Sequence, residues 1–169
     1  MTITELFQGQ LEREAKTTRT ALSRVPEGRN EWKPHEKSMN LGYLAHLVAT
    51  IPSWITMAIE QDELDLSPPG KETSWDRKFE TNREMLEAFD KCVAGAHASL
   101  AGTTDAHLKT TWRLLFAGKT VAEDPRHVVI SDSVFCHLAH HRGQLTVYLR
   151  LNGASVPVVY GPTADEGRF

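Results

Sequence analysis

The chain has 169 residues, and its 19 Lys and Arg against 22 Asp and Glu give a formal net charge of −3. This length predicts a single domain over residues 1–169 that folds without disulfides, and a hydrophobic content of 40% argues against disorder. The negative charge argues against nucleic-acid binding, which depends on clustered Lys and Arg, and two cysteines fit a reducing compartment.

Targeting and membrane signals are the next features that the sequence excludes. The first residues lack the basic and apolar regions of a secretory signal. The longest apolar stretch, around 41–59, is interrupted by His46 and Pro52, whereas a membrane span needs about 18–20 apolar residues. We therefore expect a cytoplasmic protein that makes no membrane contact.

Apolar residues recur with helical spacing in four segments, of which the first covers about 2–23. Leu6 and Leu11 lie on its expected inner face, and the segment closes before Pro26 and Gly28. These features predict an N-terminal amphipathic helix.

The second helical segment begins near Ser38 or Asn40, two residue types that favour the N-cap position. It continues with an apolar face as far as Ala58. Pro52 lies inside this segment and predicts a kink, because proline cannot donate the backbone hydrogen bond of a regular helix.

Residues 61–76 are expected to form a polar loop with a Pro-Pro-Gly break, and a third helix is expected over 77–100. Its apolar residues recur every seven positions, a spacing typical of a helix-bundle seam. They are Phe79, Leu86, Val93 and Leu100. Residues 101–123 lack a helical pattern, and 108–116 favours an extended segment or a short hairpin.

The fourth helical segment has the clearest boundaries. Asp124 is a suitable N-cap, Pro125 suits the first helical position, and Asn152 with Gly153 marks the end. Four amphipathic helices without a convincing sheet predict an all-α fold, a four-helix bundle with a short irregular or extended insert between the third and fourth helices.

The chain has eight histidines, and two of them lie on the apolar face of the fourth helix. At 100° per residue, His141 lies about 40° from His137, and Val134 and Leu145 lie on the same side. An unpaired buried polar group costs about 1–3 kcal/mol, so two imidazoles facing the core need partners. A divalent metal satisfies both at a spacing known for zinc ligands on helices. The alternative is a pair of structural histidines bonded to neighbouring polar side chains.

A metal ion on this pair requires a third protein ligand, and His46 in the second segment is the best candidate. It lies at the border of the apolar stripe, where a lone histidine is more often structural. Gln144 and Tyr148 share the face of the histidine pair and are candidates to orient a ligand or a substrate, or to form a polar pair in the core. Arg142 points away from this face, and we expect it to bind a loop, the tail or a partner subunit.

Two regions of the chain resemble the DinB-like proteins, the DinB/YfiT superfamily. HLAHHRGQLTVYLRLNG (137–153) and VPVVYGPTADE (156–166) resemble that family's last helix and tail. WKPHEKSMNLGYLAHLVATIPSW (32–54) resembles its second helix and the approach to it. The resemblance implies a four-helix bundle along the whole chain.

The resemblance also implies a divalent-metal site whose ligands are His46, His137 and His141. In that family the metal is zinc, nickel or manganese, and the proteins are commonly homodimers. The better understood branches are transferases that use low-molecular-weight thiols and a maleylpyruvate isomerase, so a thiol is a candidate cosubstrate. This sequence contains no recognisable thiol-binding motif, and the resemblance therefore does not define the reaction.

Three neutral imidazoles leave a metal ion its full charge and at least one open position. A bound water or thiol there loses its proton near neutral pH and becomes a nucleophile. We therefore expect a metal-dependent enzyme, thiol transferase-like or hydrolytic, that acts on small molecules in stress or detoxification. The alternative is a non-catalytic dimeric bundle with a structural or sensory metal. No catalytic residue beyond the ligands is assigned.

Overall fold

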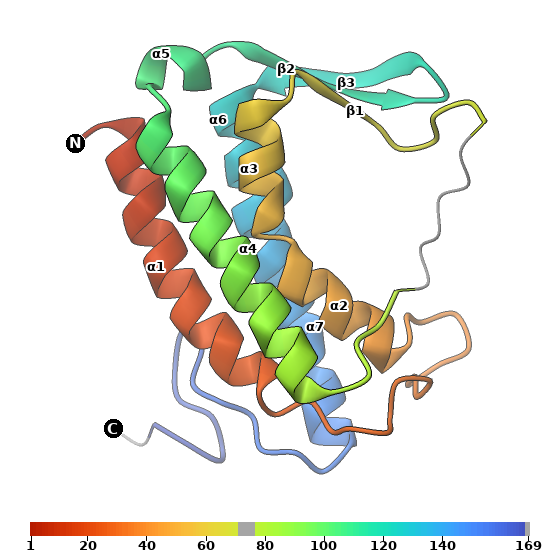
Figure 1. Cartoon of the computed structure of the whole chain (residues 1–169). Helices are drawn as coiled ribbons and strands as arrows, with labels where there is room; N and C mark the ends of the chain where they lie inside the picture. Colours follow the sequence, from red (N-terminus) through yellow and green to blue (C-terminus); the bar gives the residue numbers. More distant parts are fainter. Residues whose placement is uncertain (71–76, 168–169) are drawn as a thin grey trace.

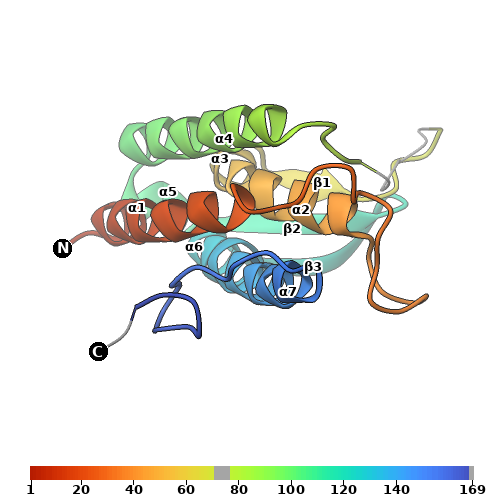
Figure 2. The ribbon, with the colours of Figure 1, turned by 90° about the horizontal axis from the view of Figure 1, so that it is seen from below.

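The computed structural model of the protein describes residues 1–70 and 77–167. Its principal helices pack lengthwise around one hydrophobic core (Figure 1). They are α1 (Ile3–Leu22), α2 (Leu41–Thr50), α3 (Ser53–Glu60), α4 (Asn82–Gly102) and α7 (His137–Leu151). Figure 2 shows α4 and α7 on opposite sides of α1 and α2. The mostly helical architecture that the sequence predicts is confirmed.

Helix α1 occupies the predicted segment because its first turn is capped by its own sequence. The Thr2 side chain accepts a hydrogen bond from the Glu5 N–H, and the Glu5 carboxylate accepts one from the Thr2 N–H. Phe7 and Leu11 are buried, whereas Leu6, expected on the inner face, is 43% exposed. The prediction for Leu6 is wrong because the buried stripe is centred on Phe7, about 100° away around the helix.

Pro52 divides the predicted second helix into α2 and α3. Helix α2 begins after Asn40, whose side chain accepts a hydrogen bond from the Tyr43 N–H. The chain bends by 50° between α2 and α3, because Pro52 has no N–H to continue the helical bonding. No single helix in the described part of the chain is long and apolar enough to cross a membrane. The bent α2–α3 pair is long and apolar enough when its two helices are taken together, by length and composition alone.

A small three-stranded sheet corrects the prediction of a purely all-α fold. Strands β2 (Thr111–Phe116) and β3 (Lys119–Pro125) form an antiparallel hairpin, in the segment that was expected to be irregular or extended. The hairpin turn uses Ala117 and Gly118, with φ values of 50° and 75°. Positive φ at both central residues matches the twist of two-residue hairpins.

Strand β1 (Glu63–Asp65) adds to this hairpin, parallel to β2, in the order β1-β2-β3. It lies in the stretch 61–76 that the sequence presents as a polar loop, and residues 71–76 of that stretch lie outside the described residues. A three-residue strand is too short to show an alternating pattern, and its partner is distant in sequence. In Figure 1 the sheet lies at the end of the bundle beside α3.

Helix α4 begins at Asn82, later than the expected start at residue 77, because the Thr81 side chain caps its first turn. Of the four apolar residues spaced by seven, Leu100 is buried in the core and Leu86 and Val93 pack at its edge. Phe79 lies before the helix and also packs on the core. The short α5 (Asp105–Leu108) then leads into the sheet.

The last helical run consists of α6 (Arg126–Val129), a π-helix η1 (Ile130–Cys136) and α7. The expected N-cap is wrong, because Asp124 and Pro125 belong to β3 and pair with β2. The end of α7 is as predicted, with Gly153 at a φ of 75°.

Arg126, which no local sequence pattern marks as important, binds the end of another helix. Its side chain is buried, and Nη1 donates to the Ala58 carbonyl (2.6 Å) in the last turn of α3. It also pairs with Asp62, directly before β1. This arginine therefore connects the last helical run to the junction between α3 and the sheet.

Arg142 holds the C-terminal tail against α1 and α7, which confirms the expectation that it binds the tail. The guanidinium is 1% exposed, and Nη2 lies 2.6 Å from the Glu14 carboxylate of α1. Nη2 also donates to the Tyr160 hydroxyl (2.6 Å), and the guanidinium lies over the Tyr160 ring at 5.0 Å. These contacts fix the orientation of α7 about its own axis relative to α1.

Candidate metal centre

The histidine pair on α7 is the centre of the candidate site. The Nε2 atoms of His137 and His141 lie 2.7 Å apart, and the two ring centroids are 4.5 Å apart. His141 is buried and His137 is half-buried. His137 is the first residue of α7 and follows directly on η1. Such π-helical turns are frequent at functional sites.

Burial keeps both imidazoles neutral. It lowers the pKa of His137 and of His141 below the ordinary value for histidine. Bonds to the backbone of Ser133 and to the Gln144 side chain raise these pKa values but offset only part of the effect. Both rings are therefore uncharged at neutral pH, the form in which histidine binds metal ions.

The hydrogen bonds around the pair hold the two Nε2 atoms facing each other. His141 donates from Nδ1 to the Gln144 Oε1 (2.7 Å), which leaves Nε2 unprotonated. A hydrogen bond to the backbone of Ser133 raises the pKa of His137 and counters part of the effect of burial. The His137 Nε2 lies within hydrogen-bonding distance of the His141 Nε2. Metal-binding histidines have the same outer partners, a carbonyl or amide oxygen on the second ring nitrogen.

A cation between the two Nε2 atoms fits this arrangement. In the metal-free protein one proton on Nε2 bridges the two neutral rings, and a divalent cation can take the place of that proton. Two imidazole nitrogens on one tetrahedral zinc ion lie about 3.3 Å apart, given Zn–N bonds of about 2.0–2.1 Å. The observed separation of 2.7 Å becomes compatible with shared coordination after a small rotation of either ring.

The third predicted ligand, His46 of α2, lies on the same cavity as His137. This cavity has a volume of about 760 Å³. The His46 ring stacks on Phe79 with a centroid distance of 5.1 Å, and burial, followed by the charge of Arg77, lowers its pKa. Within residues 1–70 and 77–167, no group of three or more His, Cys, Asp or Glu side chains is arranged to hold a metal ion. The structure thus pairs His137 with His141 and leaves His46 separate on the cavity wall.

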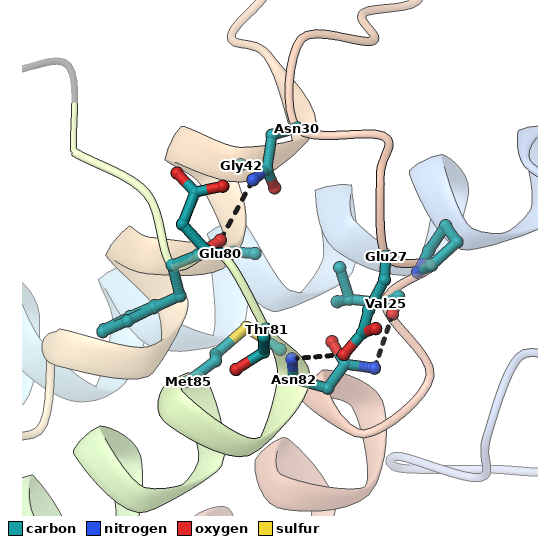
Figure 3. Close-up of a pocket in the computed structure, with 11 residues that line it drawn as sticks. Val25, Glu27, Asn30, Gly42, Glu80, Thr81, Asn82 and Met85 are labelled. Carbon is teal, nitrogen blue, oxygen red and sulfur yellow. Dashed lines mark hydrogen bonds between the residues drawn. The ribbon is translucent and has the colours of Figure 1, made fainter.

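Hydrogen bonds between two loops hold the segment that carries Phe79. The Asn30 Nδ2 donates to the Phe79 carbonyl (3.0 Å), and the Asn82 Nδ2 donates to the Val25 carbonyl (2.8 Å) (Figure 3). A Cβ on Gly42 would lie 2.9 Å from the Asn30 side chain, so only glycine lets Asn30 approach α2 this closely. These contacts position the aromatic ring against which His46 rests.

The two candidate orienting residues lie in different places. Gln144 is exposed and bonds to His141. Tyr148 donates to the Met39 carbonyl (3.0 Å) and packs edge-on against Trp32 at 5.5 Å. Tyr148 therefore holds the loop before α2 and does not line the cavity.

Sequence reasoning missed most of the cavity wall. Trp54 of α3 packs against His137 with a centroid distance of 5.3 Å. Trp112 and Leu114 of β2 and Leu64 of β1 line the same space. The apolar stripe of the second helix contains Trp54, but no local pattern predicts that β1 and β2 pair beside it.

The fold and the site define a mostly helical protein with a small sheet and a partly buried histidine pair beside a cavity. The model of the DinB family matches residues 2–168. The chain belongs to the DinB family, which confirms the resemblance found in the sequence.

Solved structures of DinB-like proteins have the same fold. The chain superposes on one from Bacillus cereus with a TM-score of 0.71 and 21% identity, over 92% of this chain and 97% of that one. For one from Bacillus subtilis the TM-score is 0.65 and the identity 17%, over 90% and 96%. At these identities the likeness supports the fold alone. No curated protein sequence matches the chain.

Proposed function

We propose that this DinB-family protein is a divalent-metal-dependent enzyme that acts on a small molecule, with His46, His137 and His141 as the metal ligands. The observation that carries the proposal is the contact of the His137 and His141 Nε2 atoms at 2.7 Å. Burial lowers the pKa of both rings, and each has a hydrogen-bond partner for its other nitrogen. Such a neutral pair binds a cation with the loss of only the proton that the two Nε2 atoms share.

The site can accept a reactant as well as an ion. A divalent metal on neutral imidazoles supplies a water or a low-molecular-weight thiol that is deprotonated near neutral pH. Gln144 holds the His141 ring in the tautomer that binds metal through Nε2, and Trp54 limits the movement of His137. The adjoining cavity has room for a substrate. These features support a thiol transferase-like or hydrolytic enzyme.

The alternative, a non-catalytic bundle with a structural or sensory metal, accounts less well for the cavity. Structural zinc sites are closed by four protein ligands, whereas three candidate ligands lie here beside a space of about 760 Å³. Imidazole ligands suit zinc or nickel better than manganese. The proposal extends to a cytoplasmic homodimer that serves stress or detoxification.

Metal analysis of protein purified without chelators tests the ligand assignment. We expect about one zinc or nickel ion per chain in the wild type and a strong loss in His141→Ala, because two imidazoles of a three-ligand site remain. His35→Ala is the control, since His35 is exposed and bonds to the Lys37 N–H. A wild-type protein without stoichiometric metal contradicts the proposal.

Activity assays separate the enzyme from the binding protein. The metal-loaded wild type is offered a chlorinated aromatic electrophile with each of several low-molecular-weight thiols, and a panel of esters without thiol. We expect turnover with at least one pair and its loss in His137→Ala and His141→Ala. Full metal occupancy without turnover of any pair favours the non-catalytic alternative.

A further inference from the structure

The cavity beside His137 is predominantly apolar. On the sheet side, Leu64 of β1 and Leu114 of β2 line it, with Leu66 just after β1. Alternate residues of a strand face the same side, which places Leu64 and Leu66 on one surface. Met57 and Leu47 contribute from the helices. The volume of about 760 Å³ lies within the range of small-molecule sites, so the walls suit an apolar molecule of that size.

The two charged side chains of the cavity differ in the partners that they have. Both carboxylate oxygens of Asp65 accept backbone hydrogen bonds, from the Ser67 N–H at 2.9 Å and the Gly118 N–H at 2.7 Å. Arg77 also lines the cavity, and its charge acts on His46. Among residues 1–70 and 77–167, Arg77 forms no ion pair. The wall therefore offers a cation close to a candidate ligand, while its carboxylate is already bonded.

Trp112 of β2 adds an aromatic ring to the cavity wall. Its indole lines the cavity and is 4% exposed. Its Nε1 is enclosed by protein and has no hydrogen-bond partner in the described part of the chain, so an occupant of the cavity meets the indole ring and not this donor.

From these contacts we propose that the site takes an amphipathic carboxylate, a small molecule with an apolar or aromatic body and an anionic group. The body packs against the apolar walls and the Trp112 indole, and the carboxylate pairs with Arg77. This inference names the substrate class of the proposed enzyme and rests on that function for its chemistry. Binding itself requires only Arg77, Trp112 and the walls.

Calorimetric titration with matched probes tests the class. The probes are 4-phenylbutyrate and 4-phenylbutanol, which share the aromatic body and differ in the anionic group. Metal-stripped and zinc-loaded proteins are both titrated. In the metal-stripped wild type we expect the acid to bind about tenfold more tightly than the alcohol, as a charge-assisted hydrogen bond provides.

A variant of the arginine assigns the preference to its residue. Arg77→Gln removes the preference for the acid. Arg113→Gln is the control, since Arg113 is exposed and pairs with Glu63 at 2.9 Å, and it keeps the preference for the acid. Equal affinity for acid and alcohol, no binding of any probe, or a preference that survives Arg77→Gln overturns the proposal.

The outcome is separable from that of the metal assay. Metal-stripped protein that prefers the acid but cannot be reloaded with metal supports the cavity proposal and contradicts the proposed function. A metal-loaded protein with turnover and no acid preference gives the opposite result.

Discussion

Replacing Glu14 by Gln leaves the Arg142 guanidinium buried without its counter-charge. The two side chains are 12% and 1% exposed and lie 2.6 Å apart. Loss of one partner of a buried ion pair costs about 3–5 kcal/mol. Thr17, Thr18 and Tyr160 still accept from the guanidinium, so we expect the lower end, about 3 kcal/mol. For a chain of this size that lowers Tm by roughly 6–12 °C.

Thermal and urea unfolding measure this loss, and Asp90→Asn is the matched control. Asp90 pairs with Arg19 at 2.8 Å, but both side chains are about half exposed, and exposed pairs contribute about 0–1 kcal/mol. Equal destabilisation by the two variants refutes the reasoning, because burial would then not decide the strength of these pairs. Proteolysis of the tail gives a second readout, since Tyr160 is held by the same guanidinium.

Three further predictions follow from the site. Burial lowers the pKa of all three candidate ligands, so the unfolded chain takes up protons first as the pH falls below about 6.5. The Tm of the metal-free protein should therefore fall as the pH is lowered from 7.5 to 5.5, and it should fall less in His141→Gln. A difference in Tm between the two proteins that does not change with pH argues against this. Gln144→Ala should weaken metal binding by about tenfold or more in competition with a chelator, because His141 loses its acceptor, while an unchanged affinity contradicts that role. Gly42→Ala should cost about 1–3 kcal/mol in urea unfolding by its clash with Asn30. Gly143→Ala, with no atom within 4 Å of the new Cβ, should cost nothing.

Local sequence predicted the helical elements well where capping and periodicity act within one segment. Thr2 and Glu5 cap α1, and Gly153 ends α7. Asp124 is a good N-cap by residue type, yet it lies in β3. There, pairing with β2 satisfies the backbone, and pairing across a sheet outweighs a local capping preference.

The candidate site also combines a feature of one helix with a feature that depends on how the helices pack. The i, i+4 spacing of His137 and His141 places both on one face of α7, and the distance between their Nε2 atoms follows from that helix. His46 lies on another helix, so its distance from the pair depends on how α2 packs. The wheel position of His46 carries no information about that packing.

The sequence alone determined the four long helical segments, that two histidines share an apolar face, and that the chain resembles the DinB family. Only the tertiary structure decided that β1 pairs with β2, that Trp112 and Arg77 line one cavity, and that Gln144 but not Tyr148 contacts the histidine pair. The physical reason is the separation along the chain of the residues that interact. Periodicity and capping act between residues within about one helical turn, whereas the cavity is formed by segments that only the packing of the core brings together.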